Sequence, residues 1–267
     1  MKIPIIKIGR NITWSLKVMK VSIITVCYNS ENTIASSINS VLSQDYNDIE
    51  YIVVDGNSND KTQDIIKGYK SEISYFISED DNGLYDAMNK GIKLSTGDII
   101  GFINSDDFLS HNSIISNIVK YFKLHNADVV YGDTYYVKRN NIHEVIRYWK
   151  AGEFSKRKYR NGWMPPHLST YIKKSVYDEH GNFRDDLQIA ADYELLLRFI
   201  MKNKVKPFYL PEVIAIMRAG GVSNSSIKNR IKSLYEVYIS WRLNDLKVSP
   251  LIMLFKPLRK VFQFIYK

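Results

Sequence analysis

The sequence of 267 residues lacks several features that would assign a protein to a class at once. It contains one cysteine, Cys27, so an internal disulfide is impossible and a reducing compartment is expected. No uninterrupted apolar run reaches the roughly 18 residues of a membrane-spanning helix, and no signal peptide is evident. We therefore expect a cytoplasmic protein without a transmembrane helix.

A glycine-rich phosphate loop is also missing. The first strand pattern, at residues 21–27, is followed by Tyr-Asn-Ser-Glu at 28–31, without a glycine. This absence argues against a dehydrogenase, which would carry Gly-x-Gly-x-x-Gly after its first strand. It also argues against a sugar-phosphate nucleotidyltransferase, which stays open as the alternative enzyme class.

Positive charge is concentrated at one end of the chain. Of the net charge of +9, residues 225–267 contribute +7, with nine Lys or Arg against two acidic residues. A nucleic-acid-binding protein would spread basic residues over one face among aromatic side chains, so we predict no nucleic-acid partner. A non-enzymatic basic protein that binds nucleic acid or membrane is the remaining alternative.

The end of this basic region has an amphipathic pattern. Between Leu251 and Ile265, apolar residues fall on one side at helical spacing and basic residues on the other, with Pro257 between them. Such a pattern favours an anchor on an anionic membrane surface. The alternative is that the apolar side packs on the protein's own core.

Strand and helix patterns alternate along the first half of the chain, which predicts an α/β fold with parallel strands and right-handed crossovers. Strands are expected at 21–27, 51–54, 73–77 and 98–103, and helices at about 34–42, up to 70, 83–94 and 114–122. After residue 128 we expect strands at 129–133 and 135–137, an irregular segment at 138–166, a helix at 190–202, an extended segment at 206–217 interrupted by two prolines, and a long helix at 225–246.

Carboxylates stand at four places along this pattern: Asp55, Asp81, the pair Asp106-Asp107, and Asp192. Three of these places directly follow apolar runs, and ligands of open α/β sheets bind at the carboxyl ends of strands. Together the acids predict a crevice for a divalent metal and a phosphorylated ligand. Taken singly, each has a structural explanation: a turn, an N-cap, or compensation of a helix dipole.

His167 and Arg218 are two further candidate site residues. His167 follows two prolines that would hold it rigidly, although a lone histidine is more often structural. Arg218 stands beside the pair Gly220-Gly221. This segment is either a loop that closes over phosphates or a simple turn.

In this order, the runs at 21–29, 51–60, 78–91 and 97–107 resemble the family 2 glycosyltransferases, which have a GT-A fold. The resemblance covers about residues 19–223. The segment 81–91, together with His167, residues 191–193 and residues 220–223, looks most like the subgroup that builds bacterial exopolysaccharide, capsule and O-antigen. The implied fold is a Rossmann-like, mixed but mostly parallel sheet flanked by helices, with a C-terminal helical appendage.

The resemblance also implies a division of the chain. Residues 1–18 would be an N-terminal extension, and residues 19–224 the catalytic domain. Its nucleotide-binding half would cover about 19–128 and its acceptor half about 129–224. Residues 225–267 would form the basic amphipathic tail.

Roles follow position by position from the resemblance. A nucleotide-sugar donor, expected to be a UDP-sugar, would be bound by Val26, Tyr28, Asn29, Asp55, Asp81, Lys90, Asn104, Ser105 and Arg218. Asp106 and Asp107 would hold Mg²⁺ or Mn²⁺, Asp192 would be the general base, and His167 would lie on the acceptor side. One position departs from the family: Asn104 stands where its Asp-x-Asp signature has the first aspartate.

The implied reaction is direct displacement at the anomeric carbon with inversion. Asp192 would take the proton of the attacking hydroxyl, and the metal would assist departure of the nucleoside diphosphate. The acceptor would be a lipid-linked or growing polysaccharide. The enzyme would then lie peripherally on the inner face of a bacterial cytoplasmic membrane.

Overall fold

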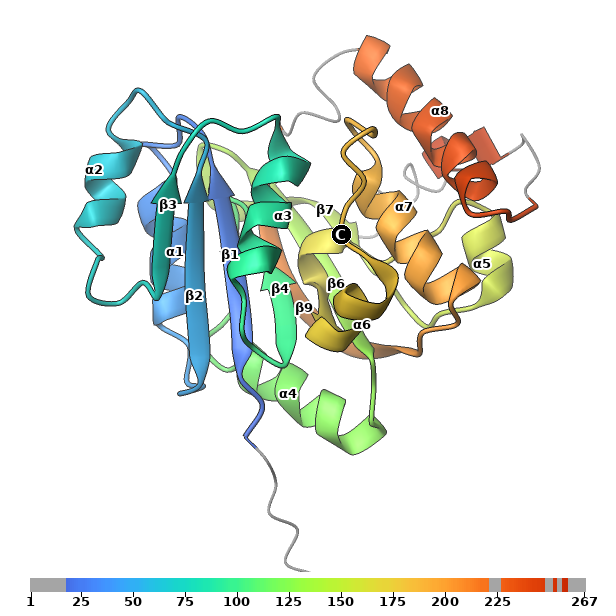
Figure 1. The fold of residues 1–267 in the computed structure, drawn as a ribbon, viewed down its shortest axis with the longest axis horizontal. Helices are drawn as coiled ribbons and strands as arrows, with labels where there is room; N and C mark the ends of the chain where they lie inside the picture. The colour runs from blue at the N-terminus through green and yellow to red at the C-terminus, as the bar shows by residue number, and fades with distance from the viewer. Residues whose placement is uncertain (1–17, 221–226, 248–251, 254–255, 259–267) are drawn as a thin grey trace, which may run out of the picture.

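The protein is built around a twisted β-sheet with helices on both faces (Figure 1). The structure is a computed structural model and describes residues 18–220, 227–247, 252–253 and 256–258. Within these residues the sheet has nine strands in the order β3-β2-β1-β4-β8-β6-β9-β5, with β7 paired to β6. The predicted α/β fold with a mixed sheet is confirmed.

The first half of the chain follows the predicted alternation. Its elements are β1 (Val21–Cys27), α1 (Ile34–Leu42), β2 (Ile49–Asp55), α2 (Thr62–Lys67), β3 (Tyr75–Ser78), α3 (Leu84–Leu94) and β4 (Ile99–Phe102). β1 pairs in parallel with β2 and β4, and β2 pairs in parallel with β3. Because the strands are parallel, the loops that follow them meet at one edge of the sheet.

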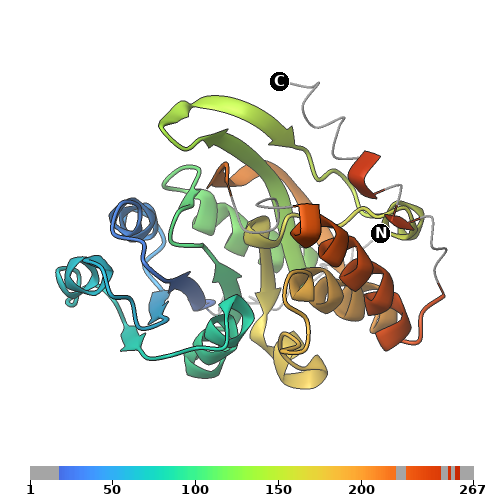
Figure 2. The same ribbon diagram turned by 90° about the horizontal axis from the view of Figure 1, so that it is seen from above.

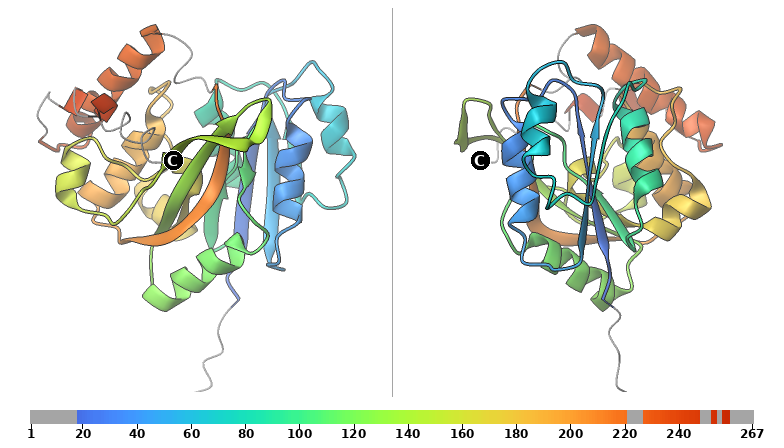
Figure 3. Two further views of the ribbon diagram at one scale, coloured as in Figure 1. Left: turned by 180° about the vertical axis from the view of Figure 1, so that it is seen from behind. Right: turned by 60° about the vertical axis from the view of Figure 1, so that its left-hand side comes forward.

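Helices cover both faces of this half. α3 lies on one face, while α1 and α4 (Ile114–His125) lie on the other (Figures 2 and 3). Gly91 permits the close approach of α3 to β1, because a Cβ at this position would lie 2.4 Å from the Ile24 side chain. Ala87 and Met88 are buried beside it, whereas Leu84 is exposed at the start of the helix.

The second half mixes strand directions. Its remaining elements are β5 (Phe108–Leu109), β6 (Val129–Lys138), β7 (Asn141–Trp149), α5 (Lys156–Arg160), a 3₁₀ turn (His167–Ser169), β8 (Thr170–Lys173), α6 (Lys174–His180), α7 (Ala191–Leu197), its π-helical continuation (Arg198–Lys202), β9 (Pro207–Arg218) and α8 (Ile227–Leu243). β6 runs parallel to β9 but antiparallel to β7 and β8. The β6–β7 hairpin leaves the plane of the sheet and extends toward α1 (Figures 2 and 3).

Three expectations for this half are wrong. The two strands expected at 129–133 and 135–137 are one strand, β6, with a bulge near Asp133. Pro211 does not interrupt β9. It lies at this same irregularity, where the regular pairing of β6 and β9 is broken, so the N–H that proline lacks is not required for a ladder hydrogen bond. The segment 138–166 is not irregular, because it contains β7 and α5. β7 acquires its order by pairing with β6, which its own sequence does not reveal.

The C-terminal helix α8 packs on the body of the protein. Val237, Ser240 and Trp241 are buried, and the helix lies along α7 (Figure 1). Residues 1–17, residues 221–226 and most of the predicted membrane anchor at 251–265 lie outside the described residues. Of that anchor segment, Ile252 is described and buried. Among the described residues, no helix combines the length and apolar content needed to cross a bilayer.

Candidate active site

One buried aspartate ties together the carboxyl ends of three parallel strands. Asp55 ends β2 and is fully buried, and its Oδ2 accepts hydrogen bonds from Ser58 N at 3.0 Å and Ser78 Oγ at 2.7 Å. The Cys27 thiol, at the end of β1, donates to Oδ1 at 3.5 Å. The structure therefore places Asp55 below the surface, where it holds the strand ends that would support a nucleoside.

Tyr28 and Asp81 lie above this cluster. Tyr28 is 60% exposed, and Asp81 Oδ1 accepts a hydrogen bond from Gly83 N at 2.8 Å. Gly56 makes room for both, because a Cβ there would lie 2.4 Å from Asp81 Oδ2 and 3.6 Å from the Tyr28 ring. The loops after β1, β2 and β3 thus bring two predicted donor-binding residues together.

Three other predicted donor-binding residues hold the loops themselves. Val26 is buried within β1. Asn29 has a positive φ of 47° and its Oδ1 accepts a hydrogen bond from Asn59 N at 3.0 Å. Lys90 Nζ donates to Asp80 O at 2.7 Å, on the loop that precedes its own helix. Their contacts with a donor stay predictions, while their contacts with the protein shape the loops of the crevice.

The turn after β4 directs its side chains to different places. Ser105 Oγ lies 2.8 Å from Ser30 Oγ, which joins this turn to the loop after β1. Among the described residues, Asn104 Oδ1 is buried without a hydrogen-bond partner. Such an unpaired acceptor is unusual in a folded protein and is often found where a ligand or ion binds. This residue stands at the position where the family signature has its first aspartate.

The two adjacent acids of this turn have opposite environments. Asp107 is 1% exposed and its Oδ1 accepts a hydrogen bond from Arg218 N at 2.9 Å. Burial and the nearby charge of Asp106 raise the pKa of Asp107 to about 8. The Asp106 side chain is 28% exposed and pairs with Arg139 Nη2 at 2.8 Å. Asp106 is therefore the carboxylate of this turn that lines an accessible pocket.

Two arginines frame Asp106. Arg218 ends β9, donates through Nη1 to the Asp106 carbonyl, and through Nη2 to Ser36 Oγ at 3.0 Å. Arg139 reaches Asp106 from the tip of the β6–β7 hairpin. Arg139 has no signal in the sequence, because no motif marks a single arginine in a segment whose strand pairing is unknown.

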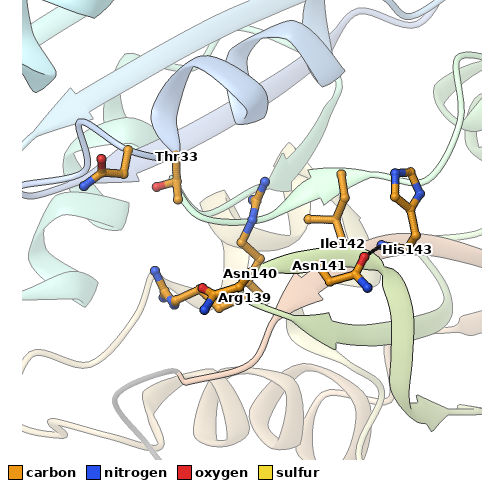
Figure 4. A pocket seen from close by; sticks show the side chains of 8 residues that line it. Thr33, Arg139, Asn140, Asn141, Ile142 and His143 are labelled. Carbon is orange, nitrogen blue, oxygen red and sulfur yellow. Dashed lines mark hydrogen bonds between the residues drawn. The ribbon is translucent and has the colours of Figure 1, made fainter.

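Two adjoining hollows lie around these groups. A pocket of about 270 Å³ is lined by Tyr28, Asn29, Ser30, Asn32, Thr33, Ser105, Asp106 and Arg139. A second, of about 500 Å³ (Figure 4), is lined by Asn32, Thr33, Arg139, Asn140, Asn141, Ile142, His143 and Arg218. Arg139 belongs to both. The lining of the larger pocket has two arginines and no acidic side chain, which suits an anionic group such as a phosphate.

Asp192 lies in the first turn of α7. Its Oδ1 accepts a hydrogen bond from Tyr193 N at 2.8 Å and is 3.3 Å from the Tyr85 hydroxyl at the start of α3. Burial, followed by the charges of Asp192 and Glu236, raises the pKa of Tyr85 well above its ordinary value. Tyr85 therefore stays a hydrogen-bond donor beside this carboxylate.

His167 and Tyr136 are two further side chains whose pKa the charge of Asp192 affects. The His167 ring packs 5.4 Å from the ring of Phe102, and burial lowers its pKa against the opposing charge of Asp192, so the imidazole is neutral at neutral pH. Burial also raises the pKa of Tyr136, against the opposing charge of Arg147, whose guanidinium lies 4.3 Å from the centre of the Tyr136 ring, while the charges of Asp107 and Asp192 add to the rise.

A divalent cation fits Asp106 alone better than it fits Asp106 and Asp107 together. Among the described residues, no three His, Cys, Asp or Glu side chains gather into a metal site. Mg²⁺ is usually held by one or two carboxylates, with substrate phosphates and waters completing its shell. Asp106, on the wall of a polar pocket, suits this mode, whereas the buried Asp107 is directed into the protein.

Comparisons with known proteins agree with this geometry. The family model of Glycosyl transferase family 2 matches residues 22–179. The chain belongs to this family. An uncharacterized glycosyltransferase of Rickettsia typhi is 30% identical over 240 residues, which cover 88% of this chain and 74% of the relative. The chain is therefore a glycosyltransferase, and the enzyme class predicted from its sequence is confirmed.

Other relatives support the family and the fold. A PGL/p-HBAD biosynthesis glycosyltransferase of Mycobacterium bovis is 26% identical over 211 residues, covering 77% of this chain and 80% of the relative. The crystal structure of S. aureus TarS 1–349 in complex with UDP has a TM-score of 0.63 at 18% identity, covering 88% of this chain and 68% of that one. The mannosyltransferase PcManGT of Pyrobaculum calidifontis, in complex with GDP-Man and Mn²⁺, has a TM-score of 0.63 at 16% identity, covering 91% and 69%.

Proposed function

We propose that this family 2 member is an inverting glycosyltransferase that moves a sugar from a UDP-sugar to a hydroxyl of a lipid-linked or growing polysaccharide. The observation that carries the proposal is the separation of two accessible acids. Asp106 lines a pocket with Arg139, whereas Asp192 lies in the first turn of α7 and outside the lining of that pocket. One acid would serve the leaving group and the other the attacking group.

The donor would lie along the loops after β1, β3 and β4. Its nucleoside would rest against Tyr28 and Asp81, above the buried Asp55. Its diphosphate would extend toward Asp106, where Arg139 and Arg218 supply positive charge. When bound at Asp106, Mg²⁺ or Mn²⁺ would neutralise charge on the departing nucleoside diphosphate.

Asp192 would act as the general base. It would accept the proton of the acceptor hydroxyl while that oxygen attacks the anomeric carbon and the bond to the diphosphate breaks. Tyr85 orients the carboxylate through its hydroxyl at 3.3 Å. The neutral His167 can donate a hydrogen bond to the acceptor sugar or accept one from it. A single displacement of this kind inverts the anomeric centre and needs no covalent intermediate.

Nucleotide binding tests the donor assignment. We expect UDP to bind in isothermal titration calorimetry at least about tenfold more tightly than GDP or dTDP. GDP differs in the polar groups of its base and dTDP lacks the ribose 2′-hydroxyl, and leaving one buried polar partner unsatisfied costs about 1–3 kcal/mol. The titration is run with and without Mn²⁺, and Mn²⁺ is expected to tighten the binding. Tighter binding of GDP would reassign the nucleoside. Absence of binding by all three nucleotides would contradict the proposed function.

We also propose that the basic tail holds the enzyme on an anionic membrane, close to a lipid-linked acceptor. The support is its sequence pattern, in which Lys256, Arg259 and Lys260 are interspersed with apolar residues. Each basic residue near an anionic surface contributes about 1 kcal/mol. Ile252, buried against the body, and Lys256, whose amine lies 4.2 Å from the Tyr193 ring, indicate that the tail begins attached to the catalytic body.

Removing two charges of the tail is expected to weaken membrane binding. The double variant Arg259→Ser, Lys260→Ser should bind vesicles of 30% phosphatidylglycerol roughly thirtyfold less well in a flotation assay, because about 2 kcal/mol of attraction is lost. Lys120→Ser, Lys123→Ser on α4 removes the same charge elsewhere and serves as the control. Equal flotation of both variants and the wild type would contradict the anchor.

A further inference from the structure

A buried carboxylate on α8 holds the turn that leads into the helix of Asp192. Glu236 is 4% exposed. Its Oε2 accepts hydrogen bonds from Ile189 N and Ala190 N, each at 2.8 Å, and its Oε1 accepts one from Gln188 N at 3.2 Å. Three consecutive backbone amides thus converge on one side chain 46 to 48 residues further along the chain.

The turn at residues 188–190 closely precedes Asp192, the predicted base, and contacts the same tyrosine, Tyr85. Ala190 is the N-cap of α7, and Asp192 follows two residues later. The carbonyl of Ile189 accepts a hydrogen bond from the Tyr85 hydroxyl at 2.9 Å, and the same hydroxyl lies 3.3 Å from Asp192 Oδ1. The peptide groups of residue 189 are therefore held by Glu236 through the N–H and by Tyr85 through the C=O.

The other polar contacts of α8 with α7 hold different parts of the helix. Trp241 Nε1 donates to the Tyr193 hydroxyl at 2.9 Å, and Asn244 Nδ2 donates to Glu194 Oε1 at 2.9 Å. These contacts, with the buried Val237 and Trp241 side chains, attach α8 to the helix as a whole. Glu236 instead holds the turn that precedes α7, and so sets the orientation of the first turn of the helix, which carries Asp192.

A carboxylate is specifically suited to this place. Burying it removes favourable hydration, which is offset only when its oxygens accept several charge-assisted hydrogen bonds. Glutamine has one acceptor oxygen, and its NH₂ group would face a backbone N–H. Aspartate is one methylene shorter and cannot reach the same amides from α8. Neither residue reproduces all three hydrogen bonds.

We propose that Glu236 is a positioning residue for catalysis, which fixes the turn 188–190 and thereby the orientation of Asp192. The inference rests on the proposed role of Asp192 as general base. It makes α8 part of the catalytic apparatus, although the helix lies beyond residues 22–179, where the family model matches, and within the segment expected to be a tail.

Three variants at one position test the proposal. Glu236→Ala and Glu236→Asp are expected to lower kcat about 10²-fold, the cost of misplacing a catalytic group by about 1 Å, with KM for the UDP-sugar and Kd for UDP within about twofold of wild type. Glu236→Gln keeps up to two of the three hydrogen bonds and should lose less. Asn244→Ala, which loosens the same α7–α8 contact without touching the turn, is the matched control and should keep kcat within about threefold.

Hydrogen exchange supplies a readout that does not depend on turnover. The amides of Gln188, Ile189 and Ala190 should exchange at least about tenfold faster in Glu236→Ala than in the wild type. Their exchange rates should be unchanged in Asn244→Ala, because only the first variant removes their acceptor. Wild-type kcat in Glu236→Ala, or kcat losses that match those of Asn244→Ala, would overturn the positioning role. If Asp192→Asn also left turnover intact while exchange at 188–190 rose as expected, the error would lie in the assignment of the base.

Discussion

Replacing Asp192 with asparagine is expected to lower kcat by about 10³-fold, within the range that a general base contributes. Asparagine keeps the shape of the side chain and an oxygen that can accept from Tyr193 N and the Tyr85 hydroxyl, as Asp192 Oδ1 does here. It cannot take the proton of the acceptor hydroxyl. Because Asp192 is not among the residues that line the two pockets sharing Arg139, Kd for UDP should stay within about twofold.

The measurement is UDP release from UDP-sugars at saturating donor, with lipid-linked saccharides extracted from bacterial membranes as acceptors. Asp186→Asn is the control, since this acid is exposed and pairs with Arg184 instead of facing the crevice. A kcat of Asp192→Asn within tenfold of the wild type would exclude the proposed base. A parallel loss of UDP affinity would instead indicate that the variant has disturbed the donor site.

Replacing Asp106 with alanine should abolish the response of UDP binding to Mn²⁺ and lower kcat/KM about 10²-fold or more, as removal of charge stabilisation at a leaving group does. Asp106 is the carboxylate in the lining of the smaller pocket, and the buried Asp107 cannot replace it without rearrangement of the turn. The loss also leaves Arg139 without the partner it has at 2.8 Å.

Calorimetric titration of UDP at several Mn²⁺ concentrations checks this expectation. Asp64→Ala on α2 removes an exposed acid that is distant from the β4 turn and is the matched control. If Mn²⁺ strengthened UDP binding equally in Asp106→Ala and the wild type, the metal would be held elsewhere. If the wild type bound UDP tightly but without response to Mn²⁺, the arginines beside Asp106 would carry the charge stabilisation without a metal.

Local sequence patterns locate the strands and helices of the first half of the chain but not all of those in the second half. In the first half, each strand is a short β-branched run and each helix carries its own apolar spacing, so local patterns were sufficient to locate them. In the second half, β7 and the bulge of β6 depend on partners elsewhere in the chain. A window of neighbouring residues contains no information about such partners.

The sequence by itself determined the family, the alternation of strands and helices, and the location of acids at strand ends. Only the tertiary structure decided which acids face the crevice. Asp106 and Asp107 are neighbours, yet one is partly exposed and the other buried, because the chain turns over residues 104–107 and Asp107 accepts a hydrogen bond from Arg218 N inside the protein. The structure also brought Arg139 to Asp106 and Glu236 to the turn before Asp192, contacts that span 33 and 46 to 48 residues. Long-range contacts of this kind arise when packed elements bring distant residues together, and they leave no periodic trace in the sequence.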